Sequence, residues 1–239
     1  MKGVVGLTLA AASLVAAPAH ASGGPRVPGS GYFIDVAAGA FYDDAVGLVY
    51  EAGVTAGCAQ GFFCPTQPVT RADMGVFLSR VVVDIGLYEI GASFGHNIFV
   101  DVPTGAYYDD EVGDLYFHGI TSGCVAPQTT PSGAIVNEGQ FCPTASVTRG
   151  EMAVFLARVI TGTLGYESAT YDGHEVFGDV ASGAFYDGAV ADIQAYQITV
   201  GCSGSGSQYC PGNLVTRGEM AVFLARLLAL LPDAPRPPE

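Results

Sequence analysis

The 239-residue sequence contains no tryptophan, and its only lysine is Lys2. Lysine and arginine together number nine against 23 aspartates and glutamates, which gives a formal net charge of −14. A protein that binds nucleic acid through a broad basic face needs clustered cations, so this composition excludes a nucleic-acid partner of that kind. Apolar residues make up 49% of the chain, which excludes a disordered acidic tail.

No catalytic constellation stands out in the sequence. There is no H-E-x-x-H motif, and so acidic a chain makes pairs of carboxylates inevitable. We expect the six cysteines to be paired, which leaves no thiol for a Cys–His nucleophile. The sequence therefore predicts a protein that is not an enzyme, has no catalytic residues and uses no cofactor.

The first residues have the pattern of a secretory signal peptide. Lys2 precedes an apolar run over 3–17, and Ala19-His20-Ala21 follows as a small-residue cleavage site. The run is shorter than the ~20 residues that span a bilayer, so we expect cleavage after Ala21 and no membrane span afterwards. Export would place the protein at the cell surface, where cysteines form disulfides.

Three stretches of the sequence repeat one pattern. Each opens with Phe-x-Asp-Val, and each closes with Val-Thr-Arg followed by apolar residues at helical spacing. The predicted organisation is a signal peptide (1–21), a Gly/Pro-rich lead (22–32), three repeats (33–98, 99–176 and 177–230) and a Pro-rich tail (231–239). The three predicted repeats are called segments 1, 2 and 3 below.

Cysteine spacing predicts one disulfide in each segment. The first Cys follows the opening Phe by 25 positions in every segment, and the Thr-Arg arginine follows the second Cys by 7. Only the stretch between the two Cys varies, with 5, 17 and 7 residues, and a bridge across it lets that loop vary. A thiolate zinc site repeats a short fixed spacing, so no metal is expected. The predicted pairs are Cys58–Cys64, Cys124–Cys142 and Cys202–Cys210.

Each segment is predicted to form a helix, a loop and a second helix. The stretches 42–52 and 108–118 have apolar residues at roughly helical spacing, and Gly53 and Gly119 stand where these helices would stop. Segment 3 has Gln197 at that position, so we expect its first helix to end differently.

The second helix of each segment opens with a capping box, a Thr followed three residues later by an acid. An apolar stripe at i, i+3, i+4 and i+7 follows, and one helix cannot bury such a stripe alone. We therefore predict an all-α fold with three helix-loop-helix repeats around a pseudo-threefold central bundle. The capping pairs are Thr70 with Asp73, Thr148 with Glu151 and Thr216 with Glu219.

An arginine stands at the first helical position after each capping Thr: Arg71, Arg149 and Arg217. A cation there opposes the helix dipole, whereas an anion bound there would meet a guanidinium and a helix N-terminus together. These arginines are candidate anion-binding residues. The alternative is a structural salt bridge to Asp35, Asp101 or Asp179.

An aromatic residue recurs eight positions after the opening Phe of each segment. Such a ring beside an arginine can stack on a sugar, and the alternative is packing in the core. The three residues are Phe41, Tyr107 and Phe185.

Taken together, these motifs resemble S-layer homology domains. The ordered set is Phe-x-Asp-Val, the aromatic residue, Gly-Val or Gly-Ile, Phe/Tyr-x-Pro at the end of the Cys loop, and Thr-Arg-Ala/Gly-Asp/Glu. It covers all three segments, with Gln197 in place of the first Gly in segment 3. The resemblance implies non-covalent attachment to the bacterial cell wall through grooves between repeats that bind a secondary cell-wall polysaccharide, often pyruvylated.

The resemblance also assigns the site. The ligand-contacting arginine of the family maps onto Arg71, Arg149 and Arg217, and the aromatic residue that is often Trp maps onto Phe41, Tyr107 and Phe185. Asp35, Asp101 and Asp179 complete the candidate glycan-binding set. We therefore expect a secreted cell-surface module that binds an anionic wall polysaccharide. The alternative is a structural module that contacts surface-layer proteins through its acidic surface and the loop 125–141.

Overall fold

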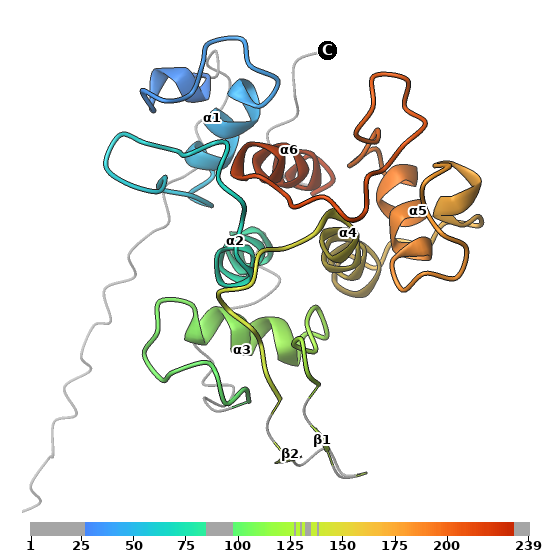
Figure 1. Cartoon of the computed structure of the whole chain (residues 1–239). Helices are drawn as coiled ribbons and strands as arrows, with labels where there is room; N and C mark the ends of the chain where they lie inside the picture. Colours follow the sequence, from blue (N-terminus) through green and yellow to red (C-terminus); the bar gives the residue numbers. More distant parts are fainter. Residues whose placement is uncertain are drawn as a thin grey trace, which may run out of the picture.

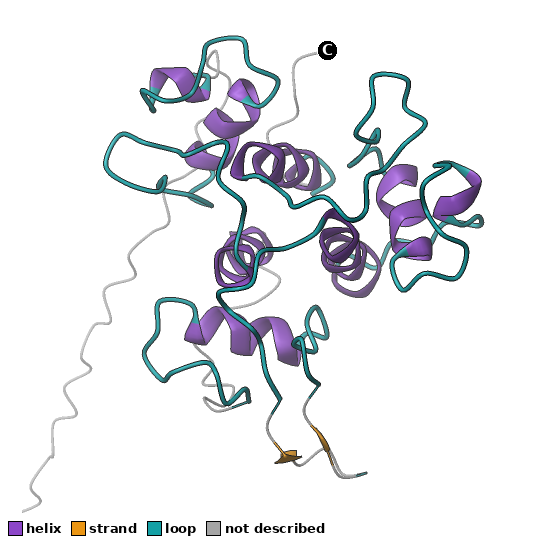
Figure 2. Cartoon of the chain, viewed as in Figure 1, coloured by secondary structure: helices purple, strands orange, loops and turns teal. Residues whose placement is uncertain are grey.

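The computed structural model describes residues 27–84, 98–126, 128–129, 131, 135–137 and 139–231. This part of the chain is helical, as the sequence predicts (Figure 2). The predicted signal peptide (1–21) and residues 232–239 of the predicted tail lie outside it. Its α-helices are α1 (Asp43–Glu51), α2 (Arg71–Asp84), α3 (Asp109–Phe117), α4 (Arg149–Ala157), α5 (Asp187–Ala195) and α6 (Arg217–Leu228).

Shorter elements fill the connections. Two 3₁₀ turns, η1 (Gly29–Gly31) and η3 (Gly173–Glu175), precede α1 and α5, and a π-helical turn, η2 (Arg158–Thr163), extends α4. The long loop of segment 2 contains the strands β1 (Gln128–Thr129) and β2 (Ile135–Asn137), paired antiparallel. This hairpin projects from the helical body (Figure 1), and the sequence analysis did not predict it.

A residue in the left-handed conformation stands two positions after the end of the first helix of each segment. Gly53 and Gly119 have φ angles of 71° and 69°, which glycine adopts at little cost. Gln197 has a φ angle of 58° at the corresponding position. The expectation that the helix of segment 3 ends differently is therefore wrong, because the chain keeps the same turn with a non-glycine residue.

Side-chain caps start the second helices. In α4 the N–H of Glu151 donates to Thr148 Oγ1 (3.2 Å), while the N–H of Thr148 donates to the Glu151 carboxylate (2.9 Å). Thr216 and Glu219 make the same reciprocal pair at α6. In α2 the N–H of Asp73 donates to Thr70 Oγ1 (3.1 Å), and the Thr70 hydroxyl donates to the Asp73 carboxylate (2.8 Å).

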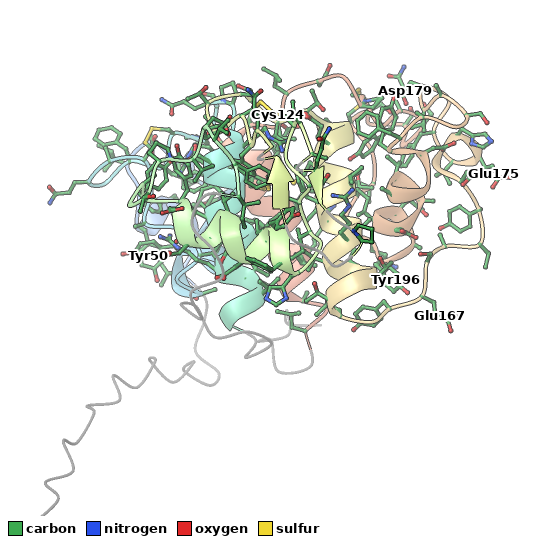
Figure 3. All side chains as sticks on the ribbon, turned by 90° about the horizontal axis from the view of Figure 1, so that it is seen from below. Tyr50, Cys124, Glu167, Glu175, Asp179 and Tyr196 are labelled. Carbon is green, nitrogen blue, oxygen red and sulfur yellow. A yellow bond between two sulfur atoms is a disulfide. The ribbon has the colours of Figure 1, made fainter. Side chains whose placement is uncertain are left out.

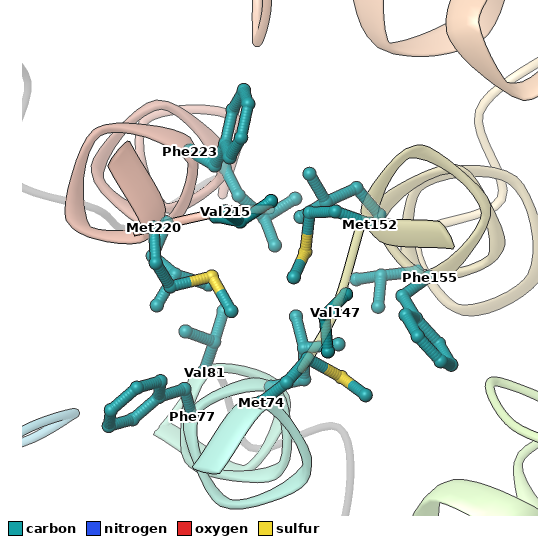
Figure 4. Close-up of a cluster of buried hydrophobic side chains, with 14 of the residues drawn as sticks. Met74, Phe77, Val81, Val147, Met152, Phe155, Val215, Met220 and Phe223 are labelled. Carbon is teal, nitrogen blue, oxygen red and sulfur yellow. The ribbon is translucent and has the colours of Figure 1, made fainter. Parts of the chain in front are cut away.

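The second helices bury their apolar stripes against one another. Met74, Met152 and Met220 lie between α2, α4 and α6 (Figure 4), and each is at most 1% exposed. The remaining stripe residues of α2 are buried as well, which removes from water a surface that one helix could not cover alone.

The first helix of each segment packs mainly on the second helix of the preceding segment. Thus α3 packs on α2, and α5 packs on α4. Helix α1 packs on α6, so the first and last α-helices of the described chain lie together (Figure 1). The packing units therefore cross the boundaries of the sequence repeats.

Three backbone hydrogen bonds connect the residues that lead into the second helices. Val69 donates to the carbonyl of Val215, Val215 donates to Val147, and Val147 donates to Val69, each over 2.9 Å. All three valines are fully buried. Because each segment donates to one neighbour and accepts from the other, the ring closes only when all three segments are present.

The variable loops are closed as the cysteine spacing predicts. Disulfides join Cys58 to Cys64, Cys124 to Cys142 and Cys202 to Cys210, each with a Cα–Cα distance of 6.0 Å. In Figure 3, Cys124 and Asp179 lie at the same end of the molecule, opposite Glu167 and Tyr196. Each disulfide loop lies near the N-terminal end of a second helix, because the residue before its second Cys accepts a hydrogen bond from the arginine that begins that helix.

Candidate functional site

The three candidate arginines are buried where one segment meets the next. Arg71, Arg149 and Arg217 are 4%, 3% and 6% exposed. Each Nε donates to a backbone carbonyl of the following segment, with segment 1 following segment 3. The acceptors are Phe141 (2.7 Å), Tyr209 (2.8 Å) and Phe63 (2.8 Å), respectively.

Aromatic rings enclose each guanidinium. The Arg71 Cζ atom lies 5.1 Å from the centroid of Phe141 and 5.3 Å from that of Phe155. Arg149 and Arg217 each have two equivalent rings at 4.9 to 5.3 Å. Cation–π contacts of this kind stabilise a charge that has been removed from water.

One nitrogen of each guanidinium has no partner. The Nη2 atoms of Arg71, Arg149 and Arg217 are enclosed and make no hydrogen bond. An enclosed donor without an acceptor costs about 1–3 kcal/mol, and more when it is charged. The same deficit recurs at the corresponding position of all three segments.

The backbone N–H groups beside these arginines are already bonded. The N–H of Arg71 donates to Ala145 (2.8 Å), and that of Ala72 donates to Pro143 (3.0 Å). The first two N–H groups of α4 and α6 donate to equivalent carbonyls, and the third of each helix bonds its capping Thr. The expectation that an anion would also meet a helix N-terminus is therefore wrong, and the guanidinium alone offers the charge.

Acids of the capping boxes pair with two of the arginines. Glu151 lies 3.6 Å from Nη1 of Arg71, and Glu219 lies 3.3 Å from Nη1 of Arg149. Within the described chain, no carboxylate oxygen lies within 4.0 Å of the guanidinium nitrogens of Arg217. Burial lowers the pKa of Arg71 and of Arg217, and neighbouring carboxylates oppose that shift.

The aspartates of the Phe-x-Asp-Val motifs hold the disulfide loops. Asp35 accepts the N–H groups of Phe63 (2.8 Å) and Cys64 (2.7 Å). Asp101 and Asp179 bond the corresponding two residues of segments 2 and 3. The alternative of a direct salt bridge from these aspartates to the candidate arginines is not found in the described residues. Capping acids pair with Arg71 and Arg149 instead.

The candidate aromatic rings are exposed. Phe41, Tyr107 and Phe185 are 72%, 65% and 73% exposed, so the alternative of core packing is wrong. The Tyr107 hydroxyl donates to Asp73 (3.1 Å), which places this ring beside the start of α2. The tyrosines that follow Phe41 and Phe185 pack on Gly218 of α6 and Gly150 of α4, so those two rings also lie near a second-helix N-terminus.

Part of this site was not predicted from the sequence. Glu151 and Glu219 were expected only to cap helices, although they also face arginines of the preceding segment. No role was expected for Phe63, Phe141 and Tyr209, which supply the carbonyl and one ring around each guanidinium. The available signal was an aromatic residue directly before the second Cys in every segment.

Two further observations concern other functions. The stretch 91–95 reads Gly-Ala-Ser-Phe-Gly and fits the spacing G-x-S-x-G, but it lies outside the described residues, and the spacing alone is a weak signal of a hydrolase. Among the described helices, none has the length and apolar character needed to cross a membrane.

Comparison with known families identifies the first part of this architecture. Residues 33–74 match the model of the S-layer homology domain. No curated protein gives a match to the chain. The matched range runs from the Phe-x-Asp-Val motif through the first disulfide loop to the start of α2. S-layer homology domains are generally non-enzymatic modules that anchor proteins at the cell wall or cell surface, and residues 33–74 are similar to such a domain.

Proposed function

We propose that this protein is a secreted cell-surface module that binds an anionic secondary cell-wall polysaccharide in grooves between neighbouring segments. In this proposal segments 1, 2 and 3 are three S-layer homology repeats around a pseudo-threefold axis. Arg71, Arg149 and Arg217 supply the positive charge of the three grooves. Phe41, Tyr107 and Phe185 supply the rings on which sugars stack.

The observation that carries the proposal is the guanidinium that one backbone carbonyl and two aromatic rings hold at each boundary between segments, with its hydrogen bonding left incomplete. A guanidinium fixed between two rings with incomplete hydrogen bonding is prepared for an anion, since little side-chain entropy remains to be lost on binding. A carboxylate on a sugar, such as a pyruvate ketal, has the charge and planar geometry that a guanidinium recognises.

The exposed rings support a sugar rather than a small free anion as the ligand. A highly exposed aromatic ring at the same position of each segment is an apolar surface that water does not favour. In this proposal Asp35, Asp101 and Asp179 act as positioning residues, because they hold the loops whose carbonyls fix the arginines.

Sedimentation with purified cell walls tests the proposal. We expect the protein lacking residues 1–21 to co-sediment with walls of its source organism, and to be released by a soluble pyruvylated saccharide. Walls treated with mild acid, which cleaves pyruvate ketals, should bind much less protein. Failure to sediment with untreated walls would reject the proposal.

A variant series separates binding from folding. Because the arginines are buried, a variant with all three changed to Gln must first show the far-UV circular dichroism and cooperative unfolding of the wild type. The matched control changes three other arginines of the second helices to Gln, namely Arg80, Arg158 and Arg226. In the wild type these arginine side chains donate to the carbonyls of Val54, Ile120 and Ile198, respectively. A folded first variant that still binds walls as the wild type does would contradict the role of these arginines.

A second candidate function is a structural module of a surface layer that works through protein contacts. The observation that favours it is the β1–β2 hairpin, which projects from the helical body (Figure 1). Concentration-dependent self-assembly without any glycan, abolished by shortening the loop 125–141 to the length found in segment 1, would support this function.

A further inference from the structure

The three arginine sites differ in one respect that the repeated sequence motif hides. Arg149 Nη1 donates to Glu219 over 3.3 Å, and Arg71 Nη1 lies 3.6 Å from Glu151. Among the described residues, Arg217 has no carboxylate oxygen within 4.0 Å. Two of the guanidinium charges are therefore partly neutralised by direct ion pairs, and the third is not.

The residue that would pair with Arg217 is shorter and is held elsewhere. Asp73 stands where α4 and α6 have Glu151 and Glu219, and its side chain has one methylene fewer. Its Oδ2 accepts the Thr70 hydroxyl (2.8 Å), and its Oδ1 accepts the Tyr107 hydroxyl (3.1 Å). The two hydroxyl groups thus occupy the Asp73 carboxylate, which makes no ion pair within 4.0 Å of the Arg217 guanidinium, although its charge still opposes the lowered pKa of Arg217.

Tyr107 supplies one of the two hydroxyl groups that bond the Asp73 carboxylate. Phe41 and Phe185 stand at the corresponding positions and have no hydroxyl that could hold a carboxylate. Burial, followed by the nearby Asp73 carboxylate, raises the pKa of Tyr107 to about 12, so its hydroxyl stays protonated and remains a donor. Its ring is nevertheless 65% exposed, which leaves a face for a sugar beside the charge.

The Arg217 guanidinium also presents an edge that an anion can reach. Its Nε is bonded to the Phe63 carbonyl, and Nη2 is its only nitrogen that is both enclosed and unpartnered. Nη1, which makes no ion pair within the described chain, is thus the nitrogen that an entering anion meets. At the other two sites an anion must first displace a glutamate.

We infer that the site formed by Arg217, Asp73 and Tyr107 is the primary anion site of the molecule, and that the Tyr107–Asp73 hydrogen bond keeps it open for a carboxylate-bearing sugar. This inference rests on the proposed function, because it ranks the three grooves that the proposal treats alike. The class of ligand is a saccharide with one exposed carboxylate. An uncharged sugar of the same shape should bind the three sites with similar affinity.

Titration followed by nuclear magnetic resonance tests the ranking directly. The ¹H–¹⁵N signals of the arginine Nε–H groups are followed while a pyruvylated monosaccharide is added, with its methyl ester as the uncharged control. We expect the Arg217 signal to move at the lowest concentration, with Arg71 and Arg149 following at higher concentration. Equal affinities at the three arginines, or earlier movement of Arg71 or Arg149, would overturn the ranking.

Variants test the cause of the ranking. Asp73→Glu restores the length found at the other sites and should weaken binding at Arg217 about threefold to fivefold, as expected for a partly exposed ion pair. Tyr107→Phe should weaken it in the same direction by releasing Asp73. Glu151→Asp is the converse variant and should strengthen binding at Arg71. Unchanged affinity in all three variants would overturn the mechanism.

The same titration separates this inference from the proposed function. If no arginine signal responds to the saccharide and the protein does not sediment with walls, the proposed function itself fails. If the arginines respond equally and wall binding persists, only the ranking fails. The thermal unfolding of each variant shows whether a lost response reflects a lost fold.

Discussion

Asp35 and Arg217, from opposite ends of the described chain, hydrogen-bond the N–H and the carbonyl of the same residue, Phe63. The Asp35 carboxylate accepts the N–H of Phe63 over 2.8 Å, and Arg217 Nε donates to the carbonyl of Phe63 over 2.8 Å. The first disulfide loop is thereby fixed between segment 1 and segment 3. Equivalent bonds fix Phe141 and Tyr209.

This relationship predicts the effect of Asp35→Asn. Asparagine keeps one acceptor oxygen, so the N–H of Phe63 or that of Cys64 loses its partner. We expect the free energy of unfolding to fall by about 1–3 kcal/mol, as for a lost hydrogen bond to a charged group. Urea denaturation provides the measurement, and Asp44→Asn is the control because Asp44 is exposed. Equal stability of Asp35→Asn and wild type would contradict the structural role of this carboxylate.

A buried aspartate predicts an unusual pH dependence. Asp114 of α3 is 7% exposed, and its Oδ2 has no hydrogen-bond partner. Burial, with smaller contributions from Asp110 and Glu111, raises the pKa of Asp114 to about 6. A raised folded pKa means that the folded state binds the proton more tightly, so this stabilisation is complete at low pH and is lost as pH rises through about 6.

Asp114→Asn should therefore stabilise the protein at pH 8 by about 1–2 kcal/mol and have little effect near pH 4. Denaturant unfolding at the two pH values measures the difference. Asp192 is the matched position in α5, and one of its oxygens accepts the N–H of Ala169 (2.7 Å). The gain from Asp192→Asn should be smaller, and a gain that grew toward low pH at either position would show that the sign is wrong.

The backbone conformation of the second cysteine in each disulfide predicts that the stability of a variant without the bridge depends on the residue that replaces this cysteine. Cys64, Cys142 and Cys210 have φ angles of 58° to 59°, a conformation that favours glycine. The double variant Cys58→Ser, Cys64→Gly should be more stable than Cys58→Ser, Cys64→Ser by about 1 kcal/mol. Thermal unfolding compares the two variants, and a less stable glycine variant would show that the backbone abandons this conformation once the bridge is lost.

Replacing glycine by alanine at the same position of two helices should have opposite effects on stability. Gly218 and Gly188 are the second residues of α6 and α5. A Cβ on Gly218 would lie 2.8 Å from the Tyr42 ring and 3.1 Å from the Pro65 carbonyl, whereas a Cβ on Gly188 would meet nothing within 4 Å. Gly218→Ala should destabilise the protein by about 1–3 kcal/mol through overpacking.

Gly188→Ala is the control and should be neutral or stabilise the protein by up to about 1 kcal/mol, because alanine favours a helix more than glycine does. Hydrogen exchange gives an independent readout. Gly218→Ala should increase exchange in α1, which packs on α6, without affecting α5. Increased exchange in α5 with α1 unchanged would contradict the observed pairing of helices.

The sequence by itself determined the local structure and the covalent connections. Capping boxes and the apolar spacing of residues such as Met74 and Leu78 depend on neighbours within one turn, so the helices could be predicted from the chain alone. The constant spacing outside each Cys loop likewise selected the three disulfides. Gln197 shows the limit of such reasoning, because its tertiary surroundings keep a turn that its residue type does not favour.

Only the tertiary structure decided which segments meet. The pairing of α1 with α6, the valine ring and the contacts of Arg217 with Phe63 join residues far apart in the chain, and no local pattern specifies such partners. The difference between the three arginine sites arises in the same way. Whether a guanidinium is neutralised depends on the position of a carboxylate in another segment, and a change of one methylene, as in Asp73, alters that distance without altering the repeated motif.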